Sequence, residues 1–277
     1  MAYRYETNPG IFQHWNRVSA QAGCRWKAYL YKRSSDRNGY INGYFLEVYS
    51  PDFTPFGAGW RIIRLKYGLY ALSSVVPGIS PLHEFQIAMA LVQPAAISHW
   101  SALNYHGMTE QVPQRVFVLT SAHILPGLRG RNIPHPQRGY PVGRTLYQFV
   151  QIKPDHFFGI TEIWVNESKV KVTDAERTCL DCLMFPEYAG GFYEVLSIFK
   201  RNISRLDIEK MIQYALRLDA ATIKRLGWIL EQQGIDLSKL ELLQKTSIKG
   251  YRLLDKTGLR KGAYNSRWMI QENLAGR

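Results

Sequence analysis

Apolar residues recur every three or four positions in several stretches of the chain, the spacing that lines one face of an α-helix. Two helices are expected near the N-terminus, over 8–22 and 24–34, with Gly23 between them. Further helices are expected over 80–92, 98–107, 173–184, 192–201, 206–216 and 220–233. Proline or glycine follows most of these stretches closely, as is common where helices end.

Other stretches are rich in β-branched and aromatic residues, which is typical of strands. In WRIIRLKYGLYAL the runs Trp60–Leu65 and Leu69–Leu72 flank a turn at 66–68 and predict a β-hairpin. Further strands are expected over 40–49, 115–120, 144–152, 158–165 and 169–172, with a β pair near 249–254 and 266–270. Strands followed by helices indicate an α+β class.

The order of these elements suggests two domains. Helices followed by a basic hairpin outline a winged helix-turn-helix-like domain over 1–76. The connector VPGIS contains the predicted linker, 77–80, and a larger mixed α/β domain with a helical C-terminal part is expected over 81–234. Residues 235–277 are expected to form a basic C-terminal extension packed on the second domain.

The charge is positive and unevenly distributed. The chain has 35 Lys and Arg against 22 Asp and Glu, a net charge of +13. Residues 1–76 hold 10 basic against 4 acidic residues, 151–200 hold 5 against 8, and 201–277 hold 15 against 8. An excess of positive charge around the hairpin favours a nucleic-acid partner. A basic protein with solvated charges is the alternative.

The hairpin supplies one set of candidate DNA contacts, and the second N-terminal helix supplies another. Contacts from a wing go mainly to phosphates, whereas a recognition helix reads bases. The candidate wing residues are Arg61, Arg64, Lys66 and Tyr67. The candidate helix residues are Arg25, Lys27, Lys32 and Arg33. An ordinary edge hairpin with solvated arginines remains the alternative.

Motifs for enzyme chemistry are missing from the sequence. There is no G-x-x-x-x-G-K-[ST], G-x-G-x-x-G, G-x-S-x-G or H-E-x-x-H. Asp174 and Asp181 are seven apart and could share a helix face, which would suit paired carboxylates. However, Thr173 and Glu176 fit a capping box, and Asp181 fits a solvated helix position. We therefore expect no enzyme activity, catalytic residue, metal or cofactor.

Cysteines and histidines have structural interpretations. Cys24, Cys179 and Cys182 are an odd number, which argues against a disulfide framework and favours structural thiols. His99 and His106 flank one helix without a third ligand nearby, so no metal site is expected, and polar packing at the helix end is expected for Tyr105 and His106. The chain has no signal peptide and no long apolar run, which predicts a cytoplasmic protein.

Four blocks in order resemble the AbiEi family of antitoxins, from type IV toxin–antitoxin and abortive-infection systems. The blocks are RLKYGLYAL, AMALVQPAAISHWSALNYHGMTEQVPQRVFVLT, VTDAERTCLDCLMFPEYAGGFYEV and LDAATIKRLGWILEQQG, within about Trp60 to Gly234. The run SALNYHGMT is the most characteristic of the family.

This resemblance implies a transcriptional regulator as well as an antitoxin. The N-terminal domain would bind double-stranded DNA at inverted repeats in its own promoter, in which case a homodimer is plausible. The larger domain would counteract a nucleotidyltransferase-type toxin, with or without direct contact. Two alternatives stay open: a stand-alone regulator without a toxin, and an enzyme that modifies the toxin or its target.

Overall fold

The computed structural model describes residues 30–32, 61–66, 69–73, 82–124, 139–166 and 168–274 of the 277-residue chain. The chain divides into two compact units, Met1–Leu82 and His83–Arg277. The helix predicted over 8–22, the strand predicted over 40–49 and the linker 77–80 lie outside the described residues.

A three-stranded antiparallel sheet is the described part of the first unit. It contains β1 (Leu30–Lys32), β2 (Arg61–Lys66) and β3 (Leu69–Ser73), in the order β1-β3-β2. The predicted β-hairpin is therefore confirmed as β2 and β3. The prediction of a helix over 24–34 is wrong for Leu30–Lys32. The backbone of these residues pairs with β3 in the sheet and does not form the hydrogen bonds of a helix.

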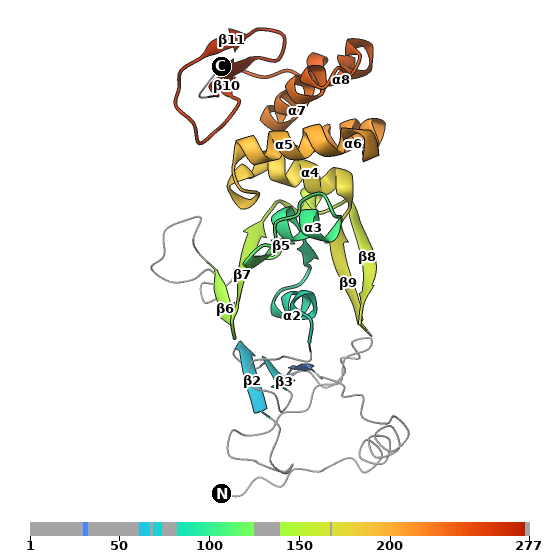
Figure 1. The fold of residues 1–277 in the computed structure, drawn as a ribbon, viewed down its shortest axis with the longest axis vertical. Coiled ribbons are helices and arrows are strands. Elements are labelled where there is room, and N and C mark those ends of the chain that lie inside the picture. The colour runs from blue at the N-terminus through green and yellow to red at the C-terminus, as the bar shows by residue number, and fades with distance from the viewer. Residues whose placement is uncertain are drawn as a thin grey trace, which may run out of the picture. The chain divides into compact units, whose positions relative to one another are not determined.

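The second unit combines a mixed sheet with a stack of helices (Figure 1), which confirms the α+β class. No helix in the described part of the chain is both long and apolar enough to cross a membrane. The strands are β4 (Ala96–Ile97), β5 (Arg115–Thr120), β6 (Tyr140–Val142), β7 (Thr145–Gln151), β8 (Ile160–Val165), β9 (Ser168–Thr173), β10 (Arg252–Leu253), β11 (Ala263–Asn265) and β12 (Ile270–Glu272). The α-helices are α2 (Glu84–Leu91), α3 (His99–Tyr105), α4 (Ala175–Met184), α5 (Phe192–Asn202), α6 (Ile208–Ala215), α7 (Ala220–Gln232) and α8 (Glu241–Lys245).

The larger sheet has six strands in the order β6-β7-β5-β4-β9-β8. β5 is parallel to β7 and antiparallel to β4, while β9 is parallel to β4 and antiparallel to β8. The sequence RVFVLT forms β5 at the middle of the sheet, and all its residues after Arg115 are buried. This burial explains its continuous apolar run, which is typical of a strand covered on both faces.

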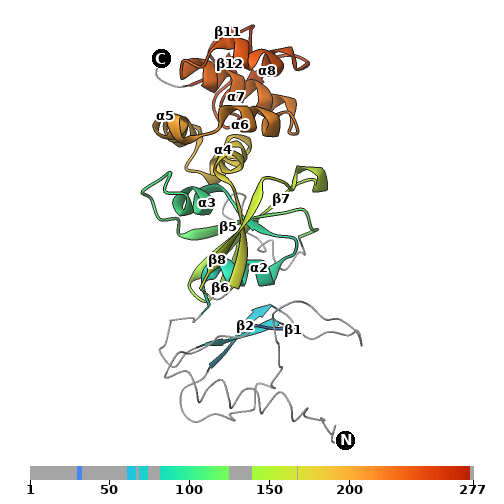
Figure 2. The ribbon, with the colours of Figure 1, turned by 90° about the vertical axis from the view of Figure 1, so that its right-hand side faces the viewer.

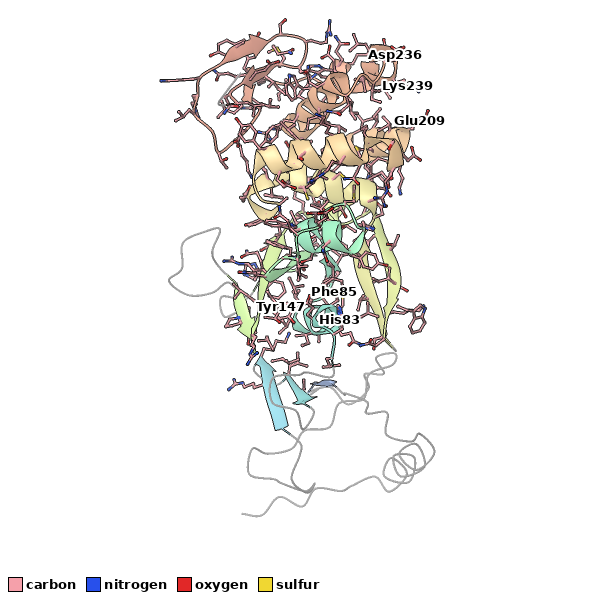
Figure 3. The ribbon with its side chains drawn as sticks, viewed as in Figure 1. His83, Phe85, Tyr147, Glu209, Asp236 and Lys239 are labelled. Atoms are coloured by element: carbon pink, nitrogen blue, oxygen red, sulfur yellow. The ribbon has the colours of Figure 1, made fainter. Side chains whose placement is uncertain are left out.

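Helix α2 was predicted over 80–92 but begins at Glu84. Its N-cap is His83, whose Nδ1 accepts from the Phe85 N–H at 3.1 Å. The side chain of Gln86 accepts in return from the His83 N–H at 2.8 Å, which completes a capping box. Figure 3 shows His83 and Phe85, whose rings meet edge to face at 4.7 Å.

The hydrophobic core continues from α3 and α4 through α5 and α6 to α7, and then into the small C-terminal sheet. These elements stack beyond one end of the six-stranded sheet (Figure 2). Helix α7 lies in the middle of this arrangement and is buried on every side from Thr222 to Leu230. Its apolar residues Ile223, Leu226, Ile229 and Leu230, which recur at helical spacing, are all buried.

Polar side chains of α7 hold the C-terminal segment in place. Buried Lys224 donates to the carbonyls of Leu243 (3.1 Å) and Gln244 (2.6 Å) at the end of α8. Arg225 Nε donates to the Leu253 carbonyl on β10 at 3.1 Å, and Trp228 Nε1 donates to Glu272 on β12 at 2.6 Å. Backbone carbonyls therefore satisfy two cations that would otherwise be costly to bury.

Close packing of Trp268 against α7 predicts a strong effect of a side chain at Gly227. A Cβ at this position would lie 2.0 Å from the ring of Trp268, which is itself fully buried. We expect Gly227→Val to reduce the free energy of unfolding by about 1–3 kcal/mol or more, because the ring has no free space to enter. Urea unfolding measures the loss. Gly234→Ala is the comparison variant, because a Cβ at Gly234 meets no atom within 4 Å. Its loss of stability measures the cost of a positive φ for a residue other than glycine, without a steric clash.

Candidate nucleic-acid interface

The hairpin of β2 and β3 has an apolar side and a charged side. Leu65, Leu69 and Ala71 are buried, while Arg64 is exposed and Lys66 is half-buried. The pairing with β3 shifts register between Arg64 and Lys66, which marks a β-bulge. Bulges bend a strand locally and redirect its side chains. The apolar side is buried, while Arg64 is exposed to solvent.

The structure places one residue of the predicted recognition helix in the same sheet as the hairpin. Lys32 lies on β1 with its Cα opposite Leu69, and the other neighbour of Leu69 is Lys66. Lys32 therefore contributes to the sheet and not to a recognition helix. Arg61 starts β2 opposite Ser73. The remaining candidates, Arg25, Lys27, Arg33 and Tyr67, lie outside the described residues.

The sequence of the hairpin is basic and contains no acidic residue. Residues 60–73 contain Arg61, Arg64 and Lys66 but no Asp or Glu. Charges of one sign attract a polyanion over roughly one Debye length, about 8 Å at physiological salt. A basic hairpin of this kind can bind phosphates.

The acidic residues near α4 form structural contacts. Asp174, and not Thr173, is the N-cap of α4: its Oδ1 accepts from the Arg177 N–H at 2.8 Å. Its Oδ2 accepts from the Tyr214 hydroxyl at 2.9 Å. Glu176 does not reach back to the cap, as was predicted, but accepts from Asp207 N at 3.1 Å and Lys210 Nζ at 2.8 Å. These bonds join the start of α4 to the start of α6.

The second carboxylate of the predicted acidic pair has a different partner. Asp181 is fully buried, which contradicts the predicted solvated position. Its Oδ1 accepts from Arg177 Nε at 2.9 Å, and both side chains are inaccessible to solvent. Burial raises the pKa of the Asp181 carboxyl, and the Arg177 charge opposes this shift. Asp174 and Asp181 thus do not face a shared site but each stabilise a separate contact.

The contact between Glu176 and Lys210 predicts a pH dependence. Burial works to raise the pKa of Glu176, but the bonds from Lys210 and Asp207 outweigh it and lower the pKa overall. A carboxylate with a lowered pKa stabilises the fold above its unfolded pKa of about 4.3, and this contribution is lost as the pH falls through the folded pKa. We expect Glu176→Gln to be less stable than the native chain at pH 7, with a difference that shrinks below about pH 4.

Urea unfolding between pH 3 and pH 7 measures this dependence. Glu209 is an exposed residue of α6 (Figure 3), so Glu209→Gln is the matched control and should change stability little at any pH. A stability difference for Glu176→Gln that stays constant across this range would show that its carboxylate is not the titrating group.

Residues of the block SALNYHGMT hold α3 against its neighbours. Ser101 Oγ donates to the Arg115 carbonyl at 3.1 Å and accepts from the Phe117 N–H at 3.0 Å, which fixes α3 on β5. His106 Nε2 lies 2.7 Å from the Thr173 carbonyl, which confirms polar packing at the helix end. The most characteristic run of the resemblance is therefore a packing element between α3, β5 and β9.

His99 has an unusual environment for a histidine. It begins α3 with a φ of 49° and is fully buried, with rings of Phe117, Phe185 and Tyr188 around it. Its Nδ1 is 2.8 Å from Ser98 Oγ, and its Nε2 has no hydrogen-bond partner in the described part of the chain. Burial lowers the pKa of His99 to about 3, so this imidazole is neutral at physiological pH.

The two cysteines of α4 are buried free thiols, as predicted. Burial raises the pKa of both Cys179 and Cys182, which makes them unreactive at neutral pH. Within the described ranges, no group of three His, Cys, Asp or Glu side chains is arranged to hold a metal ion.

The sequence patterns did not identify one exposed surface. Tyr251 and Tyr264 are 42% and 64% exposed in the C-terminal segment, and their rings meet at 4.8 Å. The sequence pattern that could have indicated this surface is the alternation of tyrosine with Lys and Arg over 249–267. The sequence predicted only a basic extension with a β pair near 249–254 and 266–270, because strands this short carry too few residues to show which face they expose.

Comparison with known proteins identifies a shared fold but no family. No protein-family model and no curated protein matches the chain. A solved structure, that of the RV2827C protein from Mycobacterium tuberculosis, matches with a TM-score of 0.50 and 10% sequence identity. The match covers 76% of this chain and 74% of that protein. At this identity the likeness concerns the fold alone.

Proposed function

We propose that the chain is a DNA-binding antitoxin of the type IV class that represses its own operon. The observation that carries the DNA-binding part is the antiparallel sheet β1-β3-β2 with exposed Arg64 on its basic hairpin. A short strand that pairs with the second strand of a hairpin is the sheet arrangement used by winged helix domains. In this proposal the hairpin is the wing and binds phosphates beside the inverted repeats of a promoter.

The antitoxin part rests on the resemblance of the second unit to AbiEi proteins. In this proposal the protein acts in the cytoplasm against a nucleotidyltransferase-type toxin encoded beside it. Each candidate catalytic carboxylate has a structural partner instead: Lys210 and Tyr214 for Asp174, and Arg177 for Asp181. These contacts favour a binding protein over an enzyme that modifies the toxin or its target.

Co-expression with the neighbouring reading frame tests the antitoxin part. Expression of that gene alone should stop growth, and joint expression with this chain should restore it. A promoter reporter in the same cells should be repressed by the native chain and released by alanine at Arg61, Arg64 and Lys66. Repression without any rescue of growth would instead favour a stand-alone regulator.

A further inference from the structure

The C-terminal segment presents a second strongly basic surface, far along the chain from the hairpin. Residues 245–267 contain seven Lys and Arg but a single acidic residue, Asp255. Asp255 is buried and accepts from the N–H and hydroxyl of Thr257, so its charge is used within the loop. The exposed positive charge of this segment is therefore largely uncompensated.

Three of the seven cations contact carboxylates, and four do not. Lys245 pairs with Glu241, Lys256 with Glu187, and Arg267 with Glu231. Within the described part of the chain, no ion pair with a carboxylate is formed by the exposed residues Lys249, Arg252, Arg260 and Lys261. Four unpaired cations within 13 positions would repel one another, which a polyanionic partner would relieve.

Aromatic rings lie among these charges. Tyr251 immediately precedes β10 and Tyr264 is in β11, and the sheet order β10-β12-β11 places one strand between them. Their rings nevertheless meet, at 4.8 Å and 67°. Gln271, which pairs with Tyr264 in the sheet, donates to the carbonyl of Gly262 at 3.4 Å, and Gly262 follows Lys261 in the chain. The backbone next to Lys261 is therefore bonded to the strand that lies between the two tyrosines.

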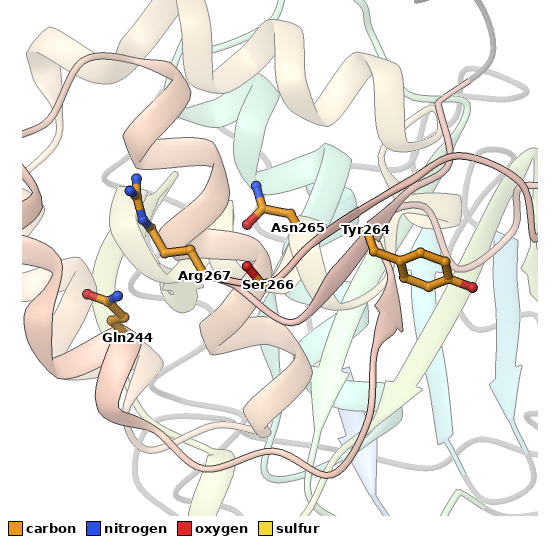
Figure 4. Close-up of a pocket in the computed structure, with 5 residues that line it drawn as sticks. All are labelled: Gln244, Tyr264, Asn265, Ser266 and Arg267. Carbon is orange, nitrogen blue, oxygen red and sulfur yellow. The ribbon is translucent and has the colours of Figure 1, made fainter.

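A polar pocket adjoins Tyr264 (Figure 4). It is lined by Gln244, Tyr264, Asn265, Ser266 and Arg267. Gln244 and Arg267 lie at one side of it and Tyr264 at the other. Asn265 is held by bonds to Glu272 (3.0 Å) and from the Trp268 N–H (3.2 Å), so the pocket wall is fixed. The amide of Gln244 and the hydroxyl of Ser266, in the same pocket as the ring of Tyr264, can form hydrogen bonds to the edge of a base.

We propose that Tyr251 and Tyr264, together with neighbouring Lys and Arg residues, form a surface that binds single-stranded nucleic acid. We call this surface the tyrosine–basic face. Unpaired bases can stack on the exposed rings of Tyr251 and Tyr264, which bases inside a duplex cannot do. Lys249, Arg260 and Lys261 bind the phosphates that connect those bases. The rigid attachment of the sheet to α7, through Trp228 and Trp268, keeps the face preformed. The face is independent of the hairpin and of the proposed function.

The test uses the full chain carrying alanine at Arg61, Arg64 and Lys66, so that the hairpin contributes no binding. Fluorescence anisotropy measures affinity for a 12-nucleotide single strand, as RNA and as DNA, and for the 12-base-pair duplex. We expect at least one of the two single strands to bind more tightly than the duplex. The difference in affinity between the RNA and the DNA strand shows whether the 2′-hydroxyl contributes to binding. Added Tyr251→Ala and Tyr264→Ala should weaken this binding about tenfold or more.

Two control variants keep the result interpretable. Lys200→Ala with Lys239→Ala removes two exposed cations elsewhere, and Trp164→Ala removes an exposed ring (68%) from β8. Neither should change binding, whereas Arg260→Ala with Lys261→Ala should weaken it and reduce its salt dependence. Absence of single-strand binding, equal affinity for the duplex, or equal loss in the controls would overturn the proposal. Circular dichroism verifies that each variant is folded.

Discussion

Asp181→Ala should reduce the free energy of unfolding by about 3–5 kcal/mol, because it leaves the Arg177 guanidinium buried without its carboxylate. Both side chains have no solvent-accessible surface, so water cannot replace the lost partner. The ring of Phe158, 4.4 Å from the guanidinium carbon, offers only partial compensation. Native proteins are stable by about 5–15 kcal/mol, and this change would therefore remove a large fraction of the total.

Urea unfolding followed by circular dichroism measures this loss. The double variant Arg177→Met, Asp181→Leu is the informative control, since replacing both members of a buried pair with apolar side chains is often neutral or stabilising. We expect it to recover most of the lost stability. A loss below about 1 kcal/mol for Asp181→Ala would mean that Arg177 reaches solvent and that the pair is not buried as described.

Alanine at Arg61, Arg64 and Lys66 together should reduce affinity for the promoter duplex by roughly 100-fold at constant salt. Each contact between an exposed cation and a phosphate contributes up to about 1 kcal/mol, and three such losses correspond to about two powers of ten. Arg64 should account for a larger share than Lys66, because Arg64 is exposed whereas Lys66 is half-buried.

A matched triple variant controls for net charge. Lys153, Lys171 and Lys200 are exposed residues of the second unit, so alanine at these positions lowers the charge of the chain by the same amount. Electrophoretic mobility shift with the chain's own promoter should show near-native affinity for this control. Equal weakening by the two triple variants would mean that overall charge, and not the hairpin, determines binding.

The hairpin could be predicted from sequence because the pattern that indicates it lies within the hairpin itself. Two β-prone runs flank the turn at 66–68, and the pattern needs no distant partner. Strand β1 could not be predicted in this way. Its three residues continue the helical spacing of the stretch 24–34, and they become a strand through pairing with Leu69–Ala71, about 40 positions away. Pairing over such distances overrides local propensity and leaves no local pattern.

The candidate site was predicted incompletely for the same reason. The cap of α4 is displaced by one residue, because Thr173 is already bonded to Thr178 and to the Ile97 carbonyl of β4. Glu176 fits a capping box locally, yet Lys210 of α6 offers it a charged partner. Arg177 and Asp181 have the i, i+4 spacing at which two side chains of one helix face each other, so their contact is consistent with the sequence. Its burial depends on how α4 packs, which spacing does not reveal.

The dependence of promoter binding on salt tests the central claim most directly. Affinities of the native chain and of the Arg61, Arg64, Lys66 alanine variant are measured from about 50 to 300 mM salt, a range over which phosphate contacts weaken strongly. The proposed wing predicts that the slope of log affinity against log salt is smaller by about 2–3 in the variant, since each lost phosphate contact contributes about 0.9. Parallel lines for the two proteins would contradict DNA binding by the hairpin.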